Sequence, residues 1–294
     1  RCGAEIVRID AAWGEPIDPE QVRTALEENP GAKFVSIVHA ETSTGVLQPL
    51  ADISKMVHQY GALLLVDAVT SLGGNPIDVD INQIDACFSG TQKCLSAPPG
   101  LAPVTVNQRA MDLIKNRKKK VQSWYLDLTM ISEYWGSERL YHHTAPISMN
   151  YALYESLRLL SGEGLIQVYY RHRRMGEALQ KGLEAMGLEM QVAKGFRLPQ
   201  LTAIRIPEGV QDDVVRSRLL REFGIEIGSG LGPLKAKIWR VGLMGQSCRR
   251  KNVIVFLSAL AYILRSEGSF IPRDDGIQAA MEHLHETEKG AITE

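Results

Sequence analysis

The chain has 294 residues, which is enough for one large domain and a smaller one. Its formal net charge of -1 provides no basic excess for nucleic-acid phosphates, and no stretch reaches the roughly 18 apolar residues of a membrane span. The four cysteines have the spacing of neither a disulfide framework nor a zinc site, so we expect a cytoplasmic protein without a structural metal.

The N-terminal segment predicts a chain that begins inside a domain. It starts at Arg1 without a methionine and continues directly into Glu5–Ile9, whose residues are typical of a strand. We therefore expect that the first part of this domain is missing.

The first half of the chain alternates short apolar runs with helical patterns. Asp18 at an N-cap position and Pro19 at the first helical position predict a helix over residues 18–29, and apolar spacing predicts another over 50–60. Nearly continuous apolar runs predict strands over residues 33–39, 63–66, 84–89 and 102–106. Such strands separated by helices indicate a parallel sheet that is covered on both faces, and therefore an α/β fold.

The second half begins with two long helical patterns, over residues 146–160 and 165–186. Shorter elements follow, with strands expected over residues 200–206, 225–227 and 237–241, and helices over residues 212–223, 251–265 and, in the charged tail, 274–289. We therefore expect a large domain over residues 1–164 and a smaller C-terminal α/β domain over residues 165–294.

Polar groups follow three of the expected strands where each strand ends. Thr42 lies in a hydroxyl-rich loop after the first of them, Asp67 ends the next, and Lys93 follows the third. In an open α/β sheet these ends meet at one crevice, where ligands bind. A lysine partly shielded from water can attack an aldehyde as a neutral amine, and a carboxylate can keep a ring nitrogen protonated.

Each of these residues also has an ordinary structural explanation. Asp67 alone fits a turn cap, and Lys93 alone fits a surface lysine. The ordered pair is more specific, because its spacing of 93 − 67 = 26 residues leaves room for one intervening element between two strands of a parallel sheet. We therefore interpret the pair as a cofactor site.

Five segments that include these residues occur in a fixed order. They are Glu41–Pro49 (ETSTGVLQP), Leu65–Gly74 (LVDAVTSLGG), Ser89–Gly100 (SGTQKCLSAPPG), Tyr141–Thr144 (YHHT) and Trp239–Gly245 (WRVGLMG). Together they resemble the class V aminotransferases, in particular the alanine–glyoxylate and serine–pyruvate aminotransferase family. The resemblance implies the type I fold of transferases that depend on pyridoxal 5'-phosphate (PLP), with a mostly parallel sheet flanked by helices and a smaller C-terminal α/β domain.

The resemblance also implies a role for each matching residue. Lys93 would hold PLP as a Schiff base and would move a proton between substrate and cofactor. Asp67 would bind the pyridinium nitrogen, and Val69 would pack on one face of the ring. Thr42 and Gln92 would hydrogen-bond the cofactor.

Two further motifs imply contacts from outside this crevice. By resemblance, Tyr141 and Thr144 would reach the phosphate of the neighbouring subunit's cofactor, so we expect a homodimer with shared active sites. Arg240 would hold the substrate α-carboxylate. A guanidinium suits this role on chemical grounds, because it binds a carboxylate through two parallel hydrogen bonds. A structural ion pair is the alternative for Arg240.

The expected reaction moves an amino group from alanine or serine to glyoxylate, giving glycine and a 2-oxo acid. Related branches use ureidoglycine or 3-hydroxykynurenine as the donor, and residues 237–252 are also similar to the purine-catabolism branch. An alternative from another class is that the chain is a non-catalytic fragment that only dimerises. A cysteine desulfurase needs an exposed, activated thiolate on a mobile loop, and Cys248 is not in an obvious long loop.

Three residues beside the motifs have structural interpretations. Alternation along an extended segment would point Cys94 away from the cofactor, and His142 and His143 lack metal-ligand partners. The family's upstream glycine-rich phosphate loop and ring-stacking aromatic have no match in this sequence. We therefore expect the chain as given to bind PLP more weakly than a version extended upstream.

Overall fold

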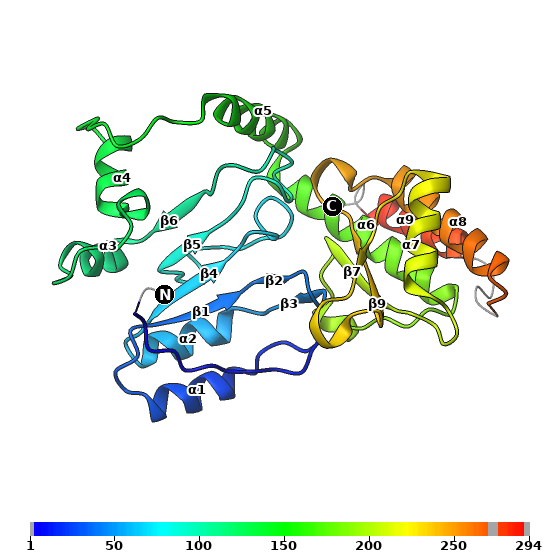
Figure 1. The fold of residues 1–294 in the computed structure, drawn as a ribbon, viewed down its shortest axis with the longest axis horizontal. Coiled ribbons are helices and arrows are strands. Elements are labelled where there is room, and N and C mark those ends of the chain that lie inside the picture. The colour runs from blue at the N-terminus through cyan, green and yellow to red at the C-terminus, as the bar shows by residue number, and fades with distance from the viewer. Residues whose placement is uncertain (1–2, 270–275, 291–294) are drawn as a thin grey trace.

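The computed structural model describes residues 3–269 and 276–290, which form two layered units joined by consecutive long helices (Figure 1). The first unit contains α1 (Pro19–Glu28), β1 (Phe34–Val38), β2 (Ala40–Glu41), β3 (Val46–Leu47), α2 (Ala51–Gln59), β4 (Leu63–Asp67), β5 (Ala86–Phe88), β6 (Val104–Val106), α3 (Gln108–Lys115), α4 (Leu128–Trp135) and α5 (Ile147–Glu163). The second contains α6 (Leu165–Ala185), β7 (Leu201–Arg205), α7 (Asp212–Phe223), β8 (Gly228–Ser229), β9 (Ile238–Gly242), α8 (Arg250–Ser266) and α9 (Gly276–Gly290).

The sheet of the first unit has the strand order β1-β4-β5-β6. The pairs β1–β4 and β4–β5 are parallel, and their register places Val38 beside Asp67 and Asp67 beside Phe88. The segment 102–106, expected to be another parallel strand, instead pairs antiparallel to β5. The chain returns through residues 89–103 without a crossover helix, and a parallel pair needs such a long connection. The sheet is therefore mostly, not wholly, parallel.

Helix α1 begins where the sequence predicts. The Asp18 side chain accepts from the Glu20 N–H, and Gln21 completes a capping box. Its buried residues Val22 and Leu26 join one face of α2 and the sheet in a single apolar core. Both faces of the sheet were expected to be covered. In β4, however, the residues on one face are buried and those on the other face are only half-buried.

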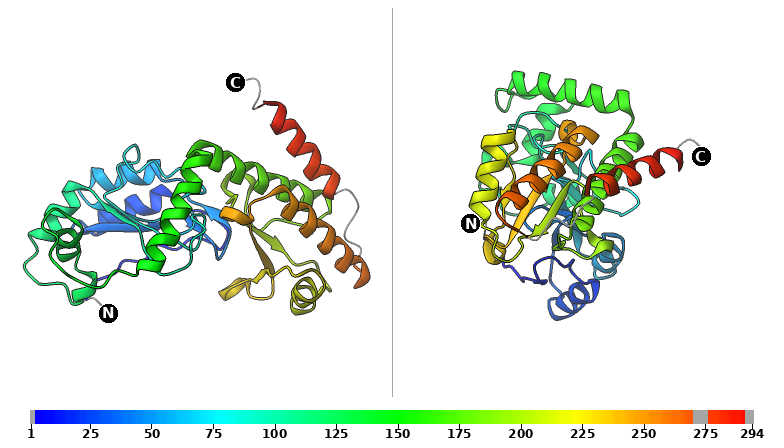
Figure 2. Two further views of the ribbon diagram at one scale, coloured as in Figure 1. Left: turned by 90° about the horizontal axis from the view of Figure 1, so that it is seen from above. Right: turned by 90° about the vertical axis from the view of Figure 1, so that its right-hand side faces the viewer.

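The second unit is built on the antiparallel sheet β7-β9-β8. Ile204 and Trp239 of this sheet are buried in one core with apolar residues of α6, α7, α8 and α9 (Figure 2). The strand expected over residues 225–227 is wrong, because Gly224 ends α7 in the left-handed conformation and the N–H of Ile225 donates to Leu219. The strand that pairs in this region is β8, two residues later.

The strand expected over Glu5–Ile9 is also wrong, since these residues join no sheet and Ile6 is 83% exposed. The sequence analysis missed α3, α4 and the short β2–β3 ribbon. For residues 274–289, the prediction holds over the described part as α9, whereas residues 274–275 lie outside the described residues. None of the described helices combines the length and the apolar character that a membrane span requires.

The two units change over at Gly164, which separates α5 from α6 and has φ of 85°. We propose this position as the boundary between a large domain of residues 1–164 and a smaller one of residues 165–294.

Candidate active site

Asp67 is the last residue of β4, at the carboxyl end of the parallel strands. Its backbone carbonyl accepts the N–H of His39, 3.0 Å away, and its Oδ1 accepts the N–H of Val69 at 2.9 Å. Within the described part of the chain, Oδ2 of this half-buried carboxylate has no hydrogen-bond partner. The side chain is thus oriented by its own loop and keeps one oxygen for another group.

The loop that carries Lys93 lies directly beside the loop after Asp67. Ser89 Oγ donates to the carbonyl of Ala68 at 3.0 Å, and Cys94 Sγ lies 3.2 Å from the carbonyl of Thr70. These contacts lie before and after Lys93 in the sequence, and Lys93 itself is half-buried. Among residues 3–269 and 276–290, the Lys93 ammonium has no hydrogen-bond or ion-pair partner.

Gly90 lies in close contact with the side chains of Gln92 and Val69. A Cβ atom built at Gly90 would lie 2.7 Å from Gln92 Oε1 and 3.5 Å from Val69 Cγ1. The first distance is shorter than real Cβ contacts, so a side chain here would displace Gln92. The structure therefore brings Val69, Gln92 and the two loops together as expected.

Arg240 reaches this region from the second sheet. It lies on β9, its Nε donates to the carbonyl of Ser229 at 2.7 Å, and its Nη1 donates to the carbonyl of Thr42 at 3.0 Å. No described residue accepts a hydrogen bond from its Nη2. The guanidinium thus joins the Thr42 loop to the smaller domain through backbone carbonyls, without the structural ion pair that was the alternative.

Tyr141 and Thr144 lie apart from these residues within the chain. The hydroxyls of the two side chains are 3.0 Å apart, and Tyr141 is 76% exposed. No contact between them and Lys93 or Asp67 occurs in the described residues. In the sequence they follow α4, a helix at the end of the first unit remote from the second (Figure 1).

These residues fit PLP. A carboxylate oxygen and an amine, both without partners in the described chain, lie at the ends of adjacent loops, where a ring nitrogen and an aldehyde carbon require them. The apolar side chain of Val69 lies close to Gly90, at the start of the Lys93 loop.

The cysteines and histidines near the site have structural environments. Burial raises the pKa of the Cys94 thiol to about 12, and burial raises that of Cys248 to about 12 as well. A thiol in this state is a poor nucleophile, which argues against desulfurase chemistry. His142 is buried against the Trp124 ring and carbonyl, and its Nδ1 lies 2.8 Å from His143 Nδ1.

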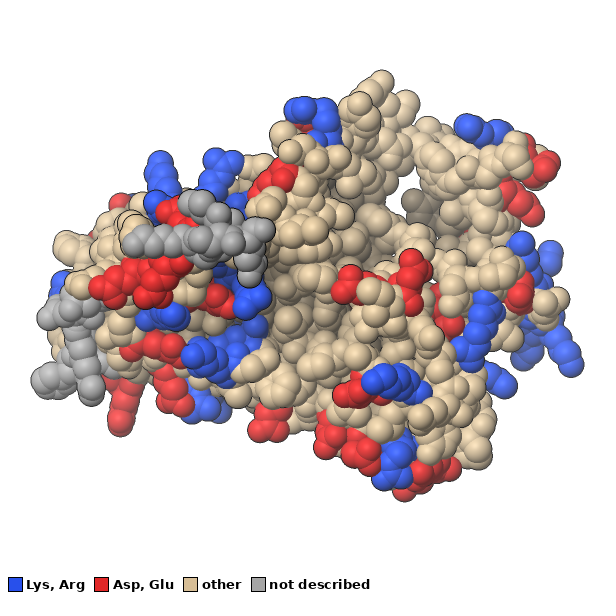
Figure 3. Space-filling model, turned by 180° about the vertical axis from the view of Figure 1, so that it is seen from behind, with Lys and Arg blue, Asp and Glu red and all other residues tan. Residues whose placement is uncertain are grey.

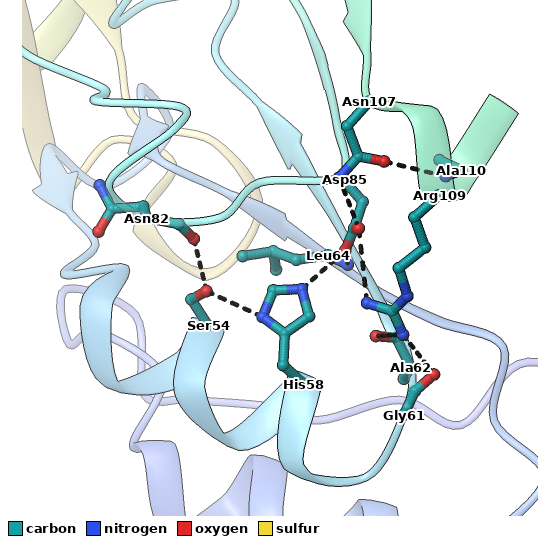
Figure 4. Close-up of polar contacts among 10 residues, drawn as sticks. All are labelled: Ser54, His58, Gly61, Ala62, Leu64, Asn82, Asp85, Asn107, Arg109 and Ala110. Atoms are coloured by element: carbon teal, nitrogen blue, oxygen red, sulfur yellow. Dashed lines mark hydrogen bonds and ion pairs between the residues drawn. The ribbon is translucent and has the colours of Figure 1, made fainter.

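A second polar cluster, at the opposite end of the same sheet, contains Ser54, His58 and Asp85 (Figure 4). His58 Nε2 lies 2.9 Å from Asp85 Oδ2, and Ser54 Oγ lies 3.3 Å from His58 Nδ1. This order of groups resembles a nucleophile, base and acid. Ser54, however, is only 4% exposed and donates its hydroxyl hydrogen to the carbonyl of Asn82, so it cannot attack a substrate. The cluster is structural.

The sequence analysis missed one contact of the site. The N–H of Gln246, in the turn after β9, donates to Ser96 Oγ at 2.9 Å, and Ser96 is three residues beyond Lys93. Gly245 was part of the motif Trp239–Gly245, but nothing in that motif indicated which loop the turn touches.

Comparison with known proteins identifies the family of the chain. Residues 1–249 match the family model described as aminotransferase class-V. The (S)-ureidoglycine–glyoxylate transaminase of Bacillus subtilis is 40% identical over 96% of this chain and 72% of its own length. The alanine–glyoxylate aminotransferase of Callithrix jacchus is 42% identical over 90% of this chain and 65% of its own.

Solved structures give the same result. The ureidoglycine–glyoxylate aminotransferase of Bacillus subtilis superposes with a TM-score of 0.90 at 42% identity, over 94% of this chain and 71% of that one. The alanine–glyoxylate aminotransferase of Nostoc sp. superposes with a TM-score of 0.87 at 48% identity, over 90% and 70%. The chain therefore belongs to the class V aminotransferase family, and it is a transaminase whose cofactor is pyridoxal phosphate.

Proposed function

We propose that the chain transfers the amino group of alanine or serine to glyoxylate, giving a 2-oxo acid and glycine. The observation that carries this proposal is that the Lys93 loop lies beside the loop after Asp67, while Arg240 of the second unit donates to the Thr42 loop of the first. An amine, a carboxylate and a guanidinium are the groups that a transamination needs for the aldehyde carbon, the ring nitrogen and the substrate carboxylate.

Lys93 and Asp67 have different roles at the cofactor. When bound, PLP withdraws electrons from the amino donor and so weakens its Cα–H bond. Oδ2 of Asp67 would accept a hydrogen bond from the ring nitrogen and keep it protonated, while Val69 N–H holds the other carboxylate oxygen. The Lys93 amine would move the proton between Cα of the substrate and C4′ of the cofactor, as general base and acid. Val69 would pack on one face of the ring, and Thr42 and Gln92 would hydrogen-bond the cofactor.

Arg240 holds the carboxylate of each substrate in turn. Nη1 and Nε are oriented by the carbonyls of Thr42 and Ser229, which fixes the plane of the guanidinium. Because both the amino donor and glyoxylate carry a carboxylate next to the reacting carbon, the same guanidinium serves both half-reactions.

Tyr141 and Thr144 act in the partner's site. Their exposure and their mutual hydrogen bond leave both hydroxyls at the surface, where they are available to a phosphate on a second copy of the chain. The active unit is therefore a homodimer in which each cofactor is held by two chains.

Glyoxylate is proposed as the acceptor because it is named for relatives on both branches, the ureidoglycine–glyoxylate and the alanine–glyoxylate enzymes. Ureidoglycine is the second candidate donor. The Bacillus subtilis relative is named for this donor, and its match covers 96% of the chain. The match to the alanine–glyoxylate enzyme of Callithrix jacchus covers 90%.

A panel of amino donors decides between them. The purified protein, loaded with PLP, is given glyoxylate with alanine, serine or ureidoglycine, and glycine is quantified by mass spectrometry. We expect the highest kcat/KM with alanine or serine, and no glycine from the Lys93→Ala variant. A preference for ureidoglycine would establish the second candidate. Equal glycine formation by wild type and Lys93→Ala would refute the transaminase assignment of this lysine.

A further inference from the structure

The turn after β9, residues 245–248, connects the strand of Arg240 to the loop of Lys93. It begins three residues beyond the end of β9. The N–H of Gln246 donates to Ser96 Oγ at 2.9 Å, and the N–H of Ser96 donates to the carbonyl of Lys93 at 3.0 Å. Two hydrogen bonds therefore lead from this turn in the smaller domain to the backbone of Lys93 in the larger one.

The turn and the Lys93 loop approach each other at backbone distance. Gly245 has φ of 52°, and a Cβ atom there would lie 1.7 Å from Ser96 Oγ and 2.9 Å from the carbonyl oxygen of Cys94. Only glycine fits between them. A small movement of this turn would therefore be passed directly to the Lys93 loop.

His172 of α6 contacts the backbone of this turn. Its ring is fully buried, and its Nδ1 lies 2.8 Å from the carbonyl of Val168. Because a carbonyl only accepts, Nδ1 carries the ring proton. Nε2 is then an acceptor, and it receives the N–H of Gly245 at 2.9 Å.

The surroundings of His172 keep its ring neutral. Burial lowers the pKa of His172 and outweighs the hydrogen bond to the Val168 carbonyl, which raises it; the Arg171 charge lowers the pKa further, against a smaller effect of Glu163. Protonation would convert Nε2 from an acceptor into a donor facing another donor.

Arg171, the residue before His172 on α6, binds the carbonyl of the same glycine, Gly245. Arg171 Nη1 donates to the carbonyls of Gly245, at 2.9 Å, and Cys248, at 3.1 Å. Its remaining nitrogens are paired with the Glu163 carboxylate. Both the N–H and the C=O of Gly245 are thus fixed by consecutive residues of one helix.

We propose that His172 is a positioning residue for transamination: by accepting the Gly245 N–H, it fixes the 245–248 turn that sets the Lys93 loop relative to Arg240. This role rests on the function proposed above for Lys93 and Arg240. His172 touches neither substrate nor cofactor and acts only through the turn.

Three variants isolate the acceptor atom. His172→Leu keeps an apolar side chain of similar size but leaves the Gly245 N–H without its acceptor. His172→Gln restores an acceptor, because the Gln amide oxygen is the same number of bonds from Cα as Nε2. His283→Leu is the matched control, since His283 is a buried histidine of the same domain that lies 3.2 Å from Glu177 on α6 and not at the turn.

In the PLP-loaded protein we expect His172→Leu to lower kcat roughly 10- to 100-fold, because catalysis falls steeply when reacting groups are misplaced. The donor KM should change by less than about threefold, as for a defect in alignment and not in binding. His172→Gln should recover most of the kcat, and His283→Leu should retain it. Equal kcat values for His172→Leu and His283→Leu, or no recovery with Gln, would overturn the proposal.

Hydrogen–deuterium exchange supplies a readout that needs no activity. His172→Leu should speed exchange in the peptide containing residues 245–248, while His172→Gln and His283→Leu should not. Unchanged exchange would also overturn the proposal. Should His172→Leu not fold, Ser96→Ala breaks the same connection from the loop side at an exposed residue and should give the same loss of kcat; wild-type kcat in this variant would count against the proposal.

A wild-type protein without transaminase activity would instead refute the proposed function. The exchange comparison would then still decide whether His172 holds the turn.

Discussion

Two aspartates at opposite ends of the same sheet differ in how many hydrogen-bond partners their carboxylates have. Asp85 is 1% exposed and accepts from Leu64 N–H, Asn107 and His58, so its carboxylate is satisfied inside the protein. Asp67 keeps one oxygen without a partner in the described chain. Asp67 is only partly buried, so this oxygen is available to a ligand.

Arg240→Lys tests the carboxylate contact. Lysine keeps the positive charge but loses the planar pair of donors, so we expect KM for the amino donor to rise roughly 10- to 100-fold with a smaller change in kcat. The measurement is steady-state kinetics over a range of donor concentrations. Arg205→Lys on the neighbouring strand β7, where the arginine pairs with surface Glu189, is the control and should leave KM unchanged. An unchanged KM for Arg240→Lys would contradict the assignment.

The sequence predicted the residues of the crevice better than their exact neighbours. Asp67 and Lys93 could be placed because strand ends follow from apolar runs, and parallel strands bring their ends together. The bonds of Arg240 to Thr42 and of Gln246 to Ser96 span 198 and 150 residues. Contacts between a backbone group and a distant side chain leave no periodic signal in a sequence, so these could not be predicted.

At the level of elements, the central strands were predicted and the connections were not. β1 and β5 lie within the apolar runs that indicated them, and β4 extends one residue beyond its run, to Asp67. The expected burial is not seen in β1, where only Ile37 is buried. The direction of β6 depends on the path of residues 89–103, which no local pattern reveals. Ile225 and Ile227 are apolar because Ile227 enters the core after α7 and Ile225 packs against it, and with Glu226 between them they imitate the alternation of a strand.

The Asp85 cluster should contribute to stability and not to activity. Asp85→Asn replaces an acceptor by an amide whose NH2 group would face other donors, and we expect a loss of about 2–4 kcal/mol in the free energy of unfolding. Urea denaturation measures it. The control is Asp52→Asn on the exposed face of α2, where the pair with Lys55 should contribute less than about 1 kcal/mol. Equal losses for the two variants would contradict this role.

The same carboxylate gives a pH dependence. Burial alone would raise the pKa of Asp85, but hydrogen bonds from Leu64, Asn107 and His58 outweigh it and hold the pKa below its ordinary value of 3.8. The folded state therefore prefers the ionised form more than the unfolded state does. Its contribution is complete above the ordinary pKa and is lost as the pH falls below it through the lower folded-state value. Asp85→Asn should flatten the stability curve in that acid range, and an unchanged curve would refute the link.

At the scale of the whole molecule, the proposed function needs residues of both units and of a second chain. Positive and negative side chains are interspersed on the face shown in Figure 3, in keeping with the net charge of -1. Lys93 belongs to the first unit and Arg240 to the second, so neither unit alone contains the proposed site.

Sharing of sites between chains can be tested by complementation. Lys93→Ala and the double variant Tyr141→Ala/Thr144→Ala should each be nearly inactive. A mixed dimer contains one site with the intact lysine and the intact hydroxyls of the other chain, so mixing the two after reversible dissociation should restore activity. Mixing Lys93→Ala with the triple variant that combines all three changes is the control and should restore none. Failure of the first mixture to recover activity would show that the hydroxyls do not act across the dimer.

The most direct measurement of the central claim is the position of the covalent bond to the cofactor. The protein is loaded with PLP and reduced with borohydride, which fixes any lysine-bound cofactor, and its peptides are mapped by mass spectrometry. We predict that the added mass lies on Lys93, with no equivalent label in Lys93→Ala. Labelling of another lysine in the wild type, with Lys93 unmodified, would contradict the account.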